Sequence, residues 1–215
     1  MSTARDIIMR AQTALQDPDG VRWPAVELVQ HLNDAQREVI RVRPDQKCTT
    51  TAVALASGYR HTIPAEAAAL MDVPNNSTGR RRRISKVDTI QLDSVAPDWR
   101  SRAGSTEIVH FMHDLREPRV FQVYPPAANA QVDLLYSLYP TDVPAPTGAA
   151  WTTVTGDVDL STSWRDALLN FVLFKAYSKD AEFGGNSQLA ASYLALFNAA
   201  VGSQLQSTAT VAPQT

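Results

Sequence analysis

Several features that often carry chemistry are scarce or missing in this sequence of 215 residues. Its one cysteine, Cys48, cannot close an intramolecular disulfide, and no cluster of Cys and His has the spacing of zinc ligands. The sequence also lacks a glycine-rich phosphate loop, a serine nucleophile between glycines, an HExxH motif and a CxxC motif. We therefore expect no disulfide, no cofactor and no enzymatic activity.

A charge excess and a long apolar run are missing as well. The chain has 20 Lys and Arg against 22 Asp and Glu, and this balance provides no general basic field for wrapping nucleic acid. The first residues contain no signal-peptide core. The longest strongly apolar stretch, 167–177, is shorter than the roughly 20 residues that span a bilayer. We expect a soluble protein that is made in the cytoplasm and does not enter a membrane.

Helical periodicity is clear near both ends of the chain. Apolar residues recur at helical spacing over 3–16 and again after Pro24, up to Arg43-Pro44. A third helix is expected from about Ser163 to Phe183, and it is apolar nearly all round, so it must be buried on several sides. A fourth, amphipathic helix is expected over 187–201.

The middle of the sequence has a different pattern. From Lys47 to about Tyr139, short segments rich in β-branched and aromatic residues alternate with turn residues, which predicts a small antiparallel sheet. The expected strands cover 49–55, 59–63, 108–113, 120–124 and 132–139, with a weak helix signal near 86–92.

The order of these elements predicts an α+β fold that is mainly α. We expect one domain over 1–215, in which 1–46 and 160–201 form a four-helix bundle core and 47–140 forms an inserted β-rich projection. The last segment, 202–215, is rich in Ser, Thr, Gln and Ala, and we expect it to be an extended tail.

Two groups of residues are candidates for catalytic or metal sites. His110 and His113 lie three apart in an expected strand and would point to opposite faces, so polar positions on a half-exposed strand are the favoured interpretation. Asp157, Asp159 and Asp166 flank an expected helix start, where carboxylates are favoured by free N–H groups and the helix dipole.

The run Arg80-Arg81-Arg82-Arg83 is the strongest local charge feature. A solvated loop, or pairing with carboxylates of a neighbouring chain, is the favoured interpretation. The alternative is contact with DNA phosphates, for which clustered arginines on a loop are suited, above all if a ring of subunits multiplies the loop. No recognition helix accompanies the run, so base-specific contacts are not indicated.

A family resemblance rests on several segments. The stretches WPAVELVQHLNDAQREVIRVRP (23–44) and WRDALLNFVLFKAYSKDAEFGGN (164–186) resemble the opening and closing helices of phage adaptor proteins, the head-to-tail connector or tail tubular A type of short-tailed phages. The segments YRHTIP (59–64), PDW (97–99), RVFQVYPP (119–126) and residues 133–139 resemble the middle section of the same family.

The resemblance implies a structural virion protein at the head-tail junction. Adaptor subunits form a ring, commonly of twelve copies, that docks beneath the portal protein, receives the tail nozzle and lets DNA pass through its lumen. The family implies no catalytic residues.

These properties indicate candidate interface residues. The apolar helix suggests subunit contacts through Trp164, Leu168, Phe171 and Phe174, and the tail suggests portal contacts through Gln204, Leu205, Val211 and Pro213. Three alternative functions remain. The first is another neck or tail-completion protein, and the second is a DNA-binding protein that acts through Arg80–Arg83. The third is an enzyme, such as a virion-associated hydrolase, that uses His110, His113 or the carboxylates of Asp157, Asp159 and Asp166.

Overall fold

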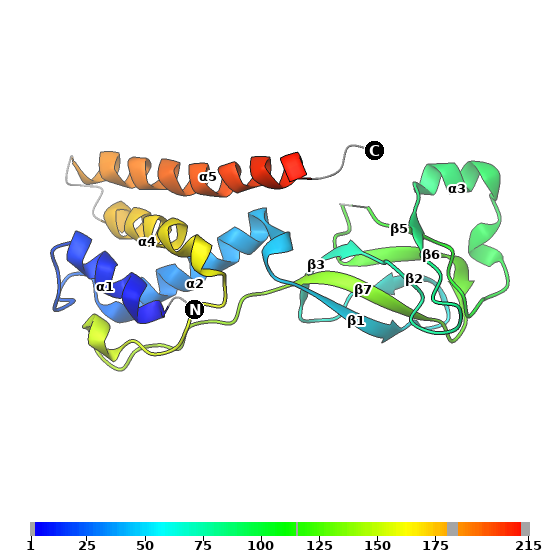
Figure 1. Ribbon diagram of the computed structural model, residues 1–215, viewed down its shortest axis with the longest axis horizontal. Coiled ribbons are helices and arrows are strands. Elements are labelled where there is room, and N and C mark those ends of the chain that lie inside the picture. The colour runs from blue at the N-terminus through cyan, green and yellow to red at the C-terminus, as the bar shows by residue number, and fades with distance from the viewer. Residues whose placement is uncertain (1–2, 115, 180–184, 212–215) are drawn as a thin grey trace. The chain divides into compact units, whose positions relative to one another are not determined.

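A computed structural model describes residues 3–114, 116–179 and 185–211, and the side chains of the last helix as far as Gly202. In this described part, the chain forms five α-helices and seven β-strands (Figure 1). They belong to two compact units, a helical unit of Met1–Gln46 with Pro140–Thr215 and a β-rich unit of Lys47–Tyr139.

The helical unit contains α1 (Ala4–Ala14), α2 (Ala25–Val42), α4 (Arg165–Lys179) and α5 (Asn186–Val211). Helix α1 begins at Thr3, whose hydroxyl accepts a hydrogen bond from the Asp6 N–H. Helices α1 and α2 each bury one apolar face, while the exposed side of α2 carries charged residues. Helix α4 is buried on several sides, as its sequence predicts.

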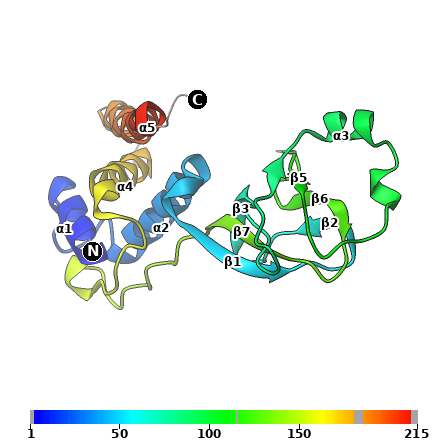
Figure 2. The ribbon, with the colours of Figure 1, turned by 45° about the vertical axis from the view of Figure 1, so that its right-hand side comes forward.

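The expected four-helix bundle core is wrong. Helix α4 packs against α1, α2 and α5, whereas α5 packs mainly against α4 alone. Figures 1 and 2 both show α5 on the side of α4 that faces away from α1 and α2. The helices therefore form layers with α4 in the middle, because α4 is the helix with apolar residues nearly all round. A fifth helix, α3 (Thr89–Val95), belongs to the β-rich unit.

The long connection after residue 140 is attached to the helices by three buried amide side chains. Gln12 accepts a hydrogen bond from the Trp151 N–H at 2.8 Å. Asn33 accepts one from the Val143 N–H at 2.9 Å, and Gln36 accepts one from the Asp159 N–H at 2.9 Å. These bonds satisfy backbone groups that a loop lying against the helices would otherwise leave unpaired.

The expected extended tail is also wrong in its larger part. Helix α5 continues as far as Val211. Ser, Gln, Thr and Ala do not stop a helix as Pro does, and the first proline after α4 is Pro213. Among the candidate portal contacts, Gln204, Leu205 and Val211 belong to this helix, and Pro213 lies outside the described residues.

The β-rich unit contains two sheets instead of one. The three-stranded sheet has the order β1 (Cys48–Ala54), β7 (Gln131–Leu138), β3 (Ala67–Asp72), and all of its pairs are antiparallel. The four-stranded sheet has the order β2 (Gly58–Thr62), β6 (Val120–Ala127), β5 (His110–Met112), β4 (Ser85–Lys86), and β4 pairs with β5 in parallel. The prediction of a single antiparallel sheet is therefore wrong. The sequences of β3 and β4 show no pattern that indicates a strand.

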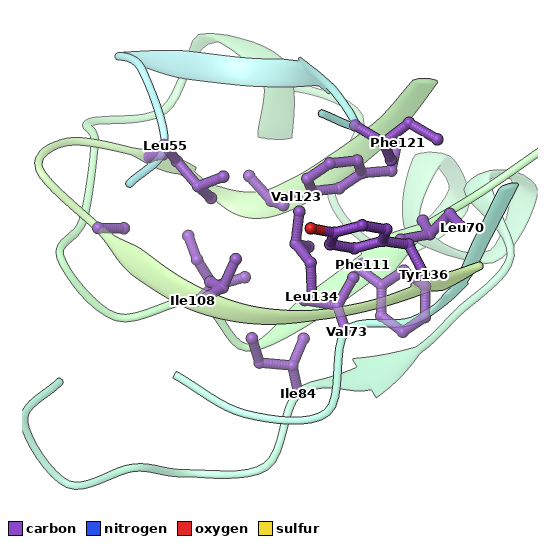
Figure 3. Close-up of a cluster of buried hydrophobic side chains, with 14 of the residues drawn as sticks. Leu55, Leu70, Val73, Ile84, Ile108, Phe111, Phe121, Val123, Leu134 and Tyr136 are labelled. Atoms are coloured by element: carbon purple, nitrogen blue, oxygen red, sulfur yellow. The ribbon is translucent and has the colours of Figure 1, made fainter. Parts of the chain in front are cut away.

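The main core of this unit draws side chains from both sheets (Figure 3). Leu70, Leu134 and Tyr136 come from the three-stranded sheet, and Phe121 and Val123 come from β6 of the other. Burial of these side chains holds the sheets together, since each fully buried large apolar side chain contributes roughly 1.5–3 kcal/mol.

The opposite face of the four-stranded sheet is covered by α3 and the turn after it. Trp99 is fully buried there, in edge-on ring contacts with Tyr59 and Tyr124, and its indole N–H donates to Asp93 at 2.7 Å. Trp99 of the segment PDW fills this small core from a short 3-10 helix. The segment therefore lies between strands but does not form a strand itself.

Candidate functional site

The arginine run forms one side of a tight hairpin between β3 and β4. The Asn76 N–H donates to the Arg82 carbonyl at 3.0 Å, and the Ile84 N–H donates to the Pro74 carbonyl at 2.9 Å. Gly79 and Arg81 at the tip have positive φ angles of 65° and 48°. A glycine suits the first of these positions because it has no Cβ.

The base of the hairpin is fixed by one buried side chain. The Asn76 amide donates to the carbonyls of Arg82 at 3.1 Å and Ile108 at 2.8 Å, and its oxygen accepts the Ile108 N–H at 2.8 Å. Asn76 is only 1% exposed. The arginines are therefore presented from a rigid base, although their own side chains lie in solvent.

The electrostatics of this hairpin differ from those of the rest of the chain. Arg82 lies 3.7 Å from the Glu107 carboxylate, a weak and exposed ion pair. In the described part of the chain, the side chains of Arg80, Arg81 and Arg83 have no ion-pair, hydrogen-bond or ring partner, whereas every other arginine has one. We name Arg80–Arg83 with the exposed Lys86 the arginine hairpin.

The candidate catalytic and metal-binding residues do not assemble into one site. His110 stacks on Tyr124, and His113 lies beyond the end of β5. Asp159 accepts the Thr141 N–H at 2.6 Å and ties the long connection in place, while Asp166 lies in the first turn of α4. In the described residues, no group of three or more His, Cys, Asp or Glu is placed to hold a metal ion.

A depression of about 700 Å³ lies between α3 and the loop after β5. Its charged lining includes Asp114 and Arg116, whose side chains form a hydrogen-bonded ion pair at 2.6 Å. The hydrogen bonds from Arg116 lower the pKa of Asp114 to about 2. This carboxylate stays ionised near neutral pH, so it is unsuited to general acid catalysis.

The four apolar candidates of α4 lie in different surroundings. Trp164 and Leu168 are fully buried in the helical unit, and Phe171 contacts Phe197 of α5 with ring centroids 5.0 Å apart. Phe174 is half buried. The apolar surface of α4 is thus largely covered inside its own chain, and a part in subunit contacts stays a prediction.

The exposed surface of α5 is not among the interfaces that the sequence predicts. Leu189 is 43% exposed and Leu196 is 53% exposed, and the whole helix contains no charged residue. Exposed helix faces are usually polar or charged, as in α2. In the sequence, this surface is indicated by the absence of charge over 26 residues, whereas the amphipathic pattern indicates only the buried face.

Comparison with known proteins gives one family. The model of the SU10 adaptor protein family matches residues 2–215. No curated protein matches the chain. None of the helices in the described residues has the length and hydropathy of a membrane span.

Proposed function

The chain belongs to the SU10 adaptor protein family, and we propose that it is the head-to-tail adaptor of a short-tailed phage. A phage adaptor is a structural protein of the virion that joins other virion proteins. In our proposal, the chain forms a ring of twelve copies that binds the portal protein, receives the tail nozzle and lets the genome pass through its lumen. The match over 2–215 is the observation that carries the proposal.

The uncharged surface of α5 supports the ring. A large apolar side chain that is exposed on an uncharged helix gains free energy when a neighbouring subunit covers it, by roughly 25 cal/mol per Å² of apolar surface. Leu189 and Leu196 lie seven residues apart and therefore on the same side of α5. We propose this side as a contact between subunits.

The adaptor function is tested by mixing the purified chain with portal rings of the same phage. Mass photometry and negative-stain imaging should show one added ring on each portal. Leu196→Lys should reduce ring formation, because a lysine would be buried against the neighbour without a partner. Gln30→Lys, on the exposed side of α2, is the matched control and should assemble normally. No association at any salt concentration would contradict the adaptor function.

The arginine hairpin supports a second part of the proposal, contact with DNA in the lumen. Arginines without carboxylate partners can bind phosphates in a bidentate manner, and a ring would repeat the hairpin around the lumen. One chain offers only a few such contacts, so the isolated protein should bind duplex DNA weakly.

The alternative, a DNA-binding protein that acts through Arg80–Arg83, makes the opposite prediction. It requires strong binding of duplex DNA by the isolated chain, with affinity that falls steeply as salt rises, by a slope of about 0.9 for each phosphate contact. Replacement of Arg80, Arg81 and Arg83 by Gln should then abolish binding. A fluorescence anisotropy titration over several salt concentrations separates the two functions.

A further inference from the structure

Arg82 differs from the other members of the arginine run because a carboxylate lies beside it. Its Nε atom lies 3.7 Å from Oε1 of Glu107, a residue far away in the sequence. The side chains of Arg80, Arg81 and Arg83 have no partner in the described part of the chain. The run therefore combines guanidinium groups that are free to bind phosphate with one that already faces a negative charge.

The oxygen that faces Arg82 is in an unusual environment. Although the side chain of Glu107 is 38% exposed as a whole, its Oε1 atom has almost no contact with solvent and accepts no hydrogen bond. A carboxylate oxygen that is shielded from water in this way is costly unless a positive charge lies near it. Salt also screens a shielded pair less than it screens the attraction between an exposed arginine and a phosphate. Arg82 and Glu107 therefore remain paired at salt concentrations that weaken contacts with DNA.

Buried hydrogen bonds hold the main chains of both residues in place. The Asn76 amide donates to the carbonyls of Arg82 at 3.1 Å and Ile108 at 2.8 Å. It thereby joins the hairpin to the residue that follows Glu107. The Ser105 hydroxyl accepts the Glu107 N–H at 3.0 Å and donates to the Glu107 carbonyl at 2.9 Å. Because the two main chains are already fixed, the ion pair costs little further conformational entropy.

We infer that Glu107 competes with phosphate for Arg82 and thereby limits the grip of the arginine hairpin on DNA. This inference rests on the proposed contact with DNA in the lumen. A guanidinium binds carboxylate and phosphate oxygens through the same donors, so a phosphate has to displace Glu107 before Arg82 can bind it in a bidentate manner. A limited affinity suits a lumen through which DNA moves, because each phosphate contact has to be broken again during passage.

Replacement of Glu107 by Gln tests the competition. Glu107→Gln nearly keeps the size of the side chain and removes its charge, so Arg82 becomes free to bind phosphate. In fluorescence anisotropy titrations with a short DNA duplex, the affinity at low salt should rise roughly two- to fivefold, which is the range that an exposed ion pair can oppose. The salt dependence should become steeper by up to about 0.9, the contribution of one phosphate contact.

Glu117→Gln is the matched control. Glu117 pairs with Arg60 at 2.8 Å, so this change removes the same charge and also frees an arginine. Arg60 lies on β2, whereas the arginine hairpin leads into β4, the opposite edge of the four-stranded sheet. The control should therefore give a much smaller gain in affinity. An equal gain in both variants would overturn the inference, because the gain would then reflect the net charge of the chain alone.

A double substitution shows whether the gain in affinity depends on Arg82. Arg82→Gln should reduce the affinity for the duplex less in the wild type than in the Glu107→Gln background, where Arg82 contacts phosphate. Equal losses in the two backgrounds would overturn the inference, since residues that act independently have additive effects. If neither the wild type nor Glu107→Gln binds the duplex at low salt, the proposed DNA contact itself is wrong, and the inference fails with it.

Discussion

At the scale of single residues, buried polar side chains do more to shape this protein than the exposed charges. Gln12, Asn33 and Gln36 hold the long connection on the helices, and Asn76 holds the arginine hairpin. Each uses its amide to satisfy backbone groups, which keeps irregular chain in a single conformation. The ion pairs of the exposed arginines are weaker contributors, because water screens them.

Replacement of Asn76 should destabilise the β-rich unit. Asn76→Ala leaves the buried Ile108 N–H and C=O without these partners, at a cost of about 1–3 kcal/mol for an unsatisfied buried group. Denaturant unfolding, followed by tryptophan fluorescence, measures the change. Asn75→Ala is the control, because Asn75 accepts the hydrogen bond from the Asp133 N–H through its backbone carbonyl. An equal loss of unfolding free energy in both variants would contradict the assignment to the Asn76 side chain.

His61 makes the stability of the same unit depend on pH. Burial lowers the pKa of this imidazole from its ordinary 6.5, and the Gly58 carbonyl at 3.1 Å opposes the shift only in part. The unfolded chain therefore takes up a proton more readily, so stability is complete above pH 6.5 and falls as pH is lowered through and below that value.

Unfolding free energies measured across this range should decline less steeply in His61→Gln than in the wild type. Burial also lowers the pKa of His31, so part of the decline remains in the variant. An unchanged slope would show that His61 is not responsible.

At the scale of elements, helix α5 combines a buried apolar side with an exposed side that carries no charge. Its buried side, with Ala190, Phe197 and Val201, completes the layer on α4, and its other side is uncharged and exposed. Residues 202–211 of the C-terminal segment are part of this helix. The proposed portal contacts Gln204, Leu205, Val211 and Pro213 would then be presented in large part from a helix and not from an extended tail.

Removal of residues 202–215 tests that proposal. The shortened chain keeps Phe197 and Val201 and should fold, with a circular dichroism spectrum that lacks only the helix signal of the removed part. Its docking onto portal rings should be lost in mass photometry. Replacement of 203–211 by an equally long uncharged helical sequence controls for length, and normal docking of the truncated chain would refute a portal contact in this segment.

At the scale of the whole molecule, the two units suggest a division of labour within the proposed adaptor. The helical unit has the uncharged α5 surface for neighbouring subunits, and the β-rich unit has the arginine hairpin. We expect a portal saturated with the chain to gain the mass of twelve copies of 23.5 kDa. Another stoichiometry would retain the adaptor function but refute the copy number.

Much of the local structure was readable in the sequence. Helices α1, α2 and α4 follow from apolar periodicity, Pro24 and the acidic first turns, because helix hydrogen bonds are local. The strands β1, β2, β6 and β7 follow from their β-branched and aromatic residues. The arginine hairpin was recognised as a charge feature, and the adaptor resemblance is confirmed by the family match, although that match does not establish a short-tailed phage.

Other features were decided only by the tertiary structure. The division of the strands between two sheets, the parallel pair β4–β5 and the layered helices depend on contacts between residues far apart in sequence, which no local pattern encodes. The partner of each exposed charged side chain likewise depends on the tertiary structure. The sequence by itself determined which segments are helical or extended and where arginines gather, whereas the fold decided which apolar faces are covered and in which order the strands pair.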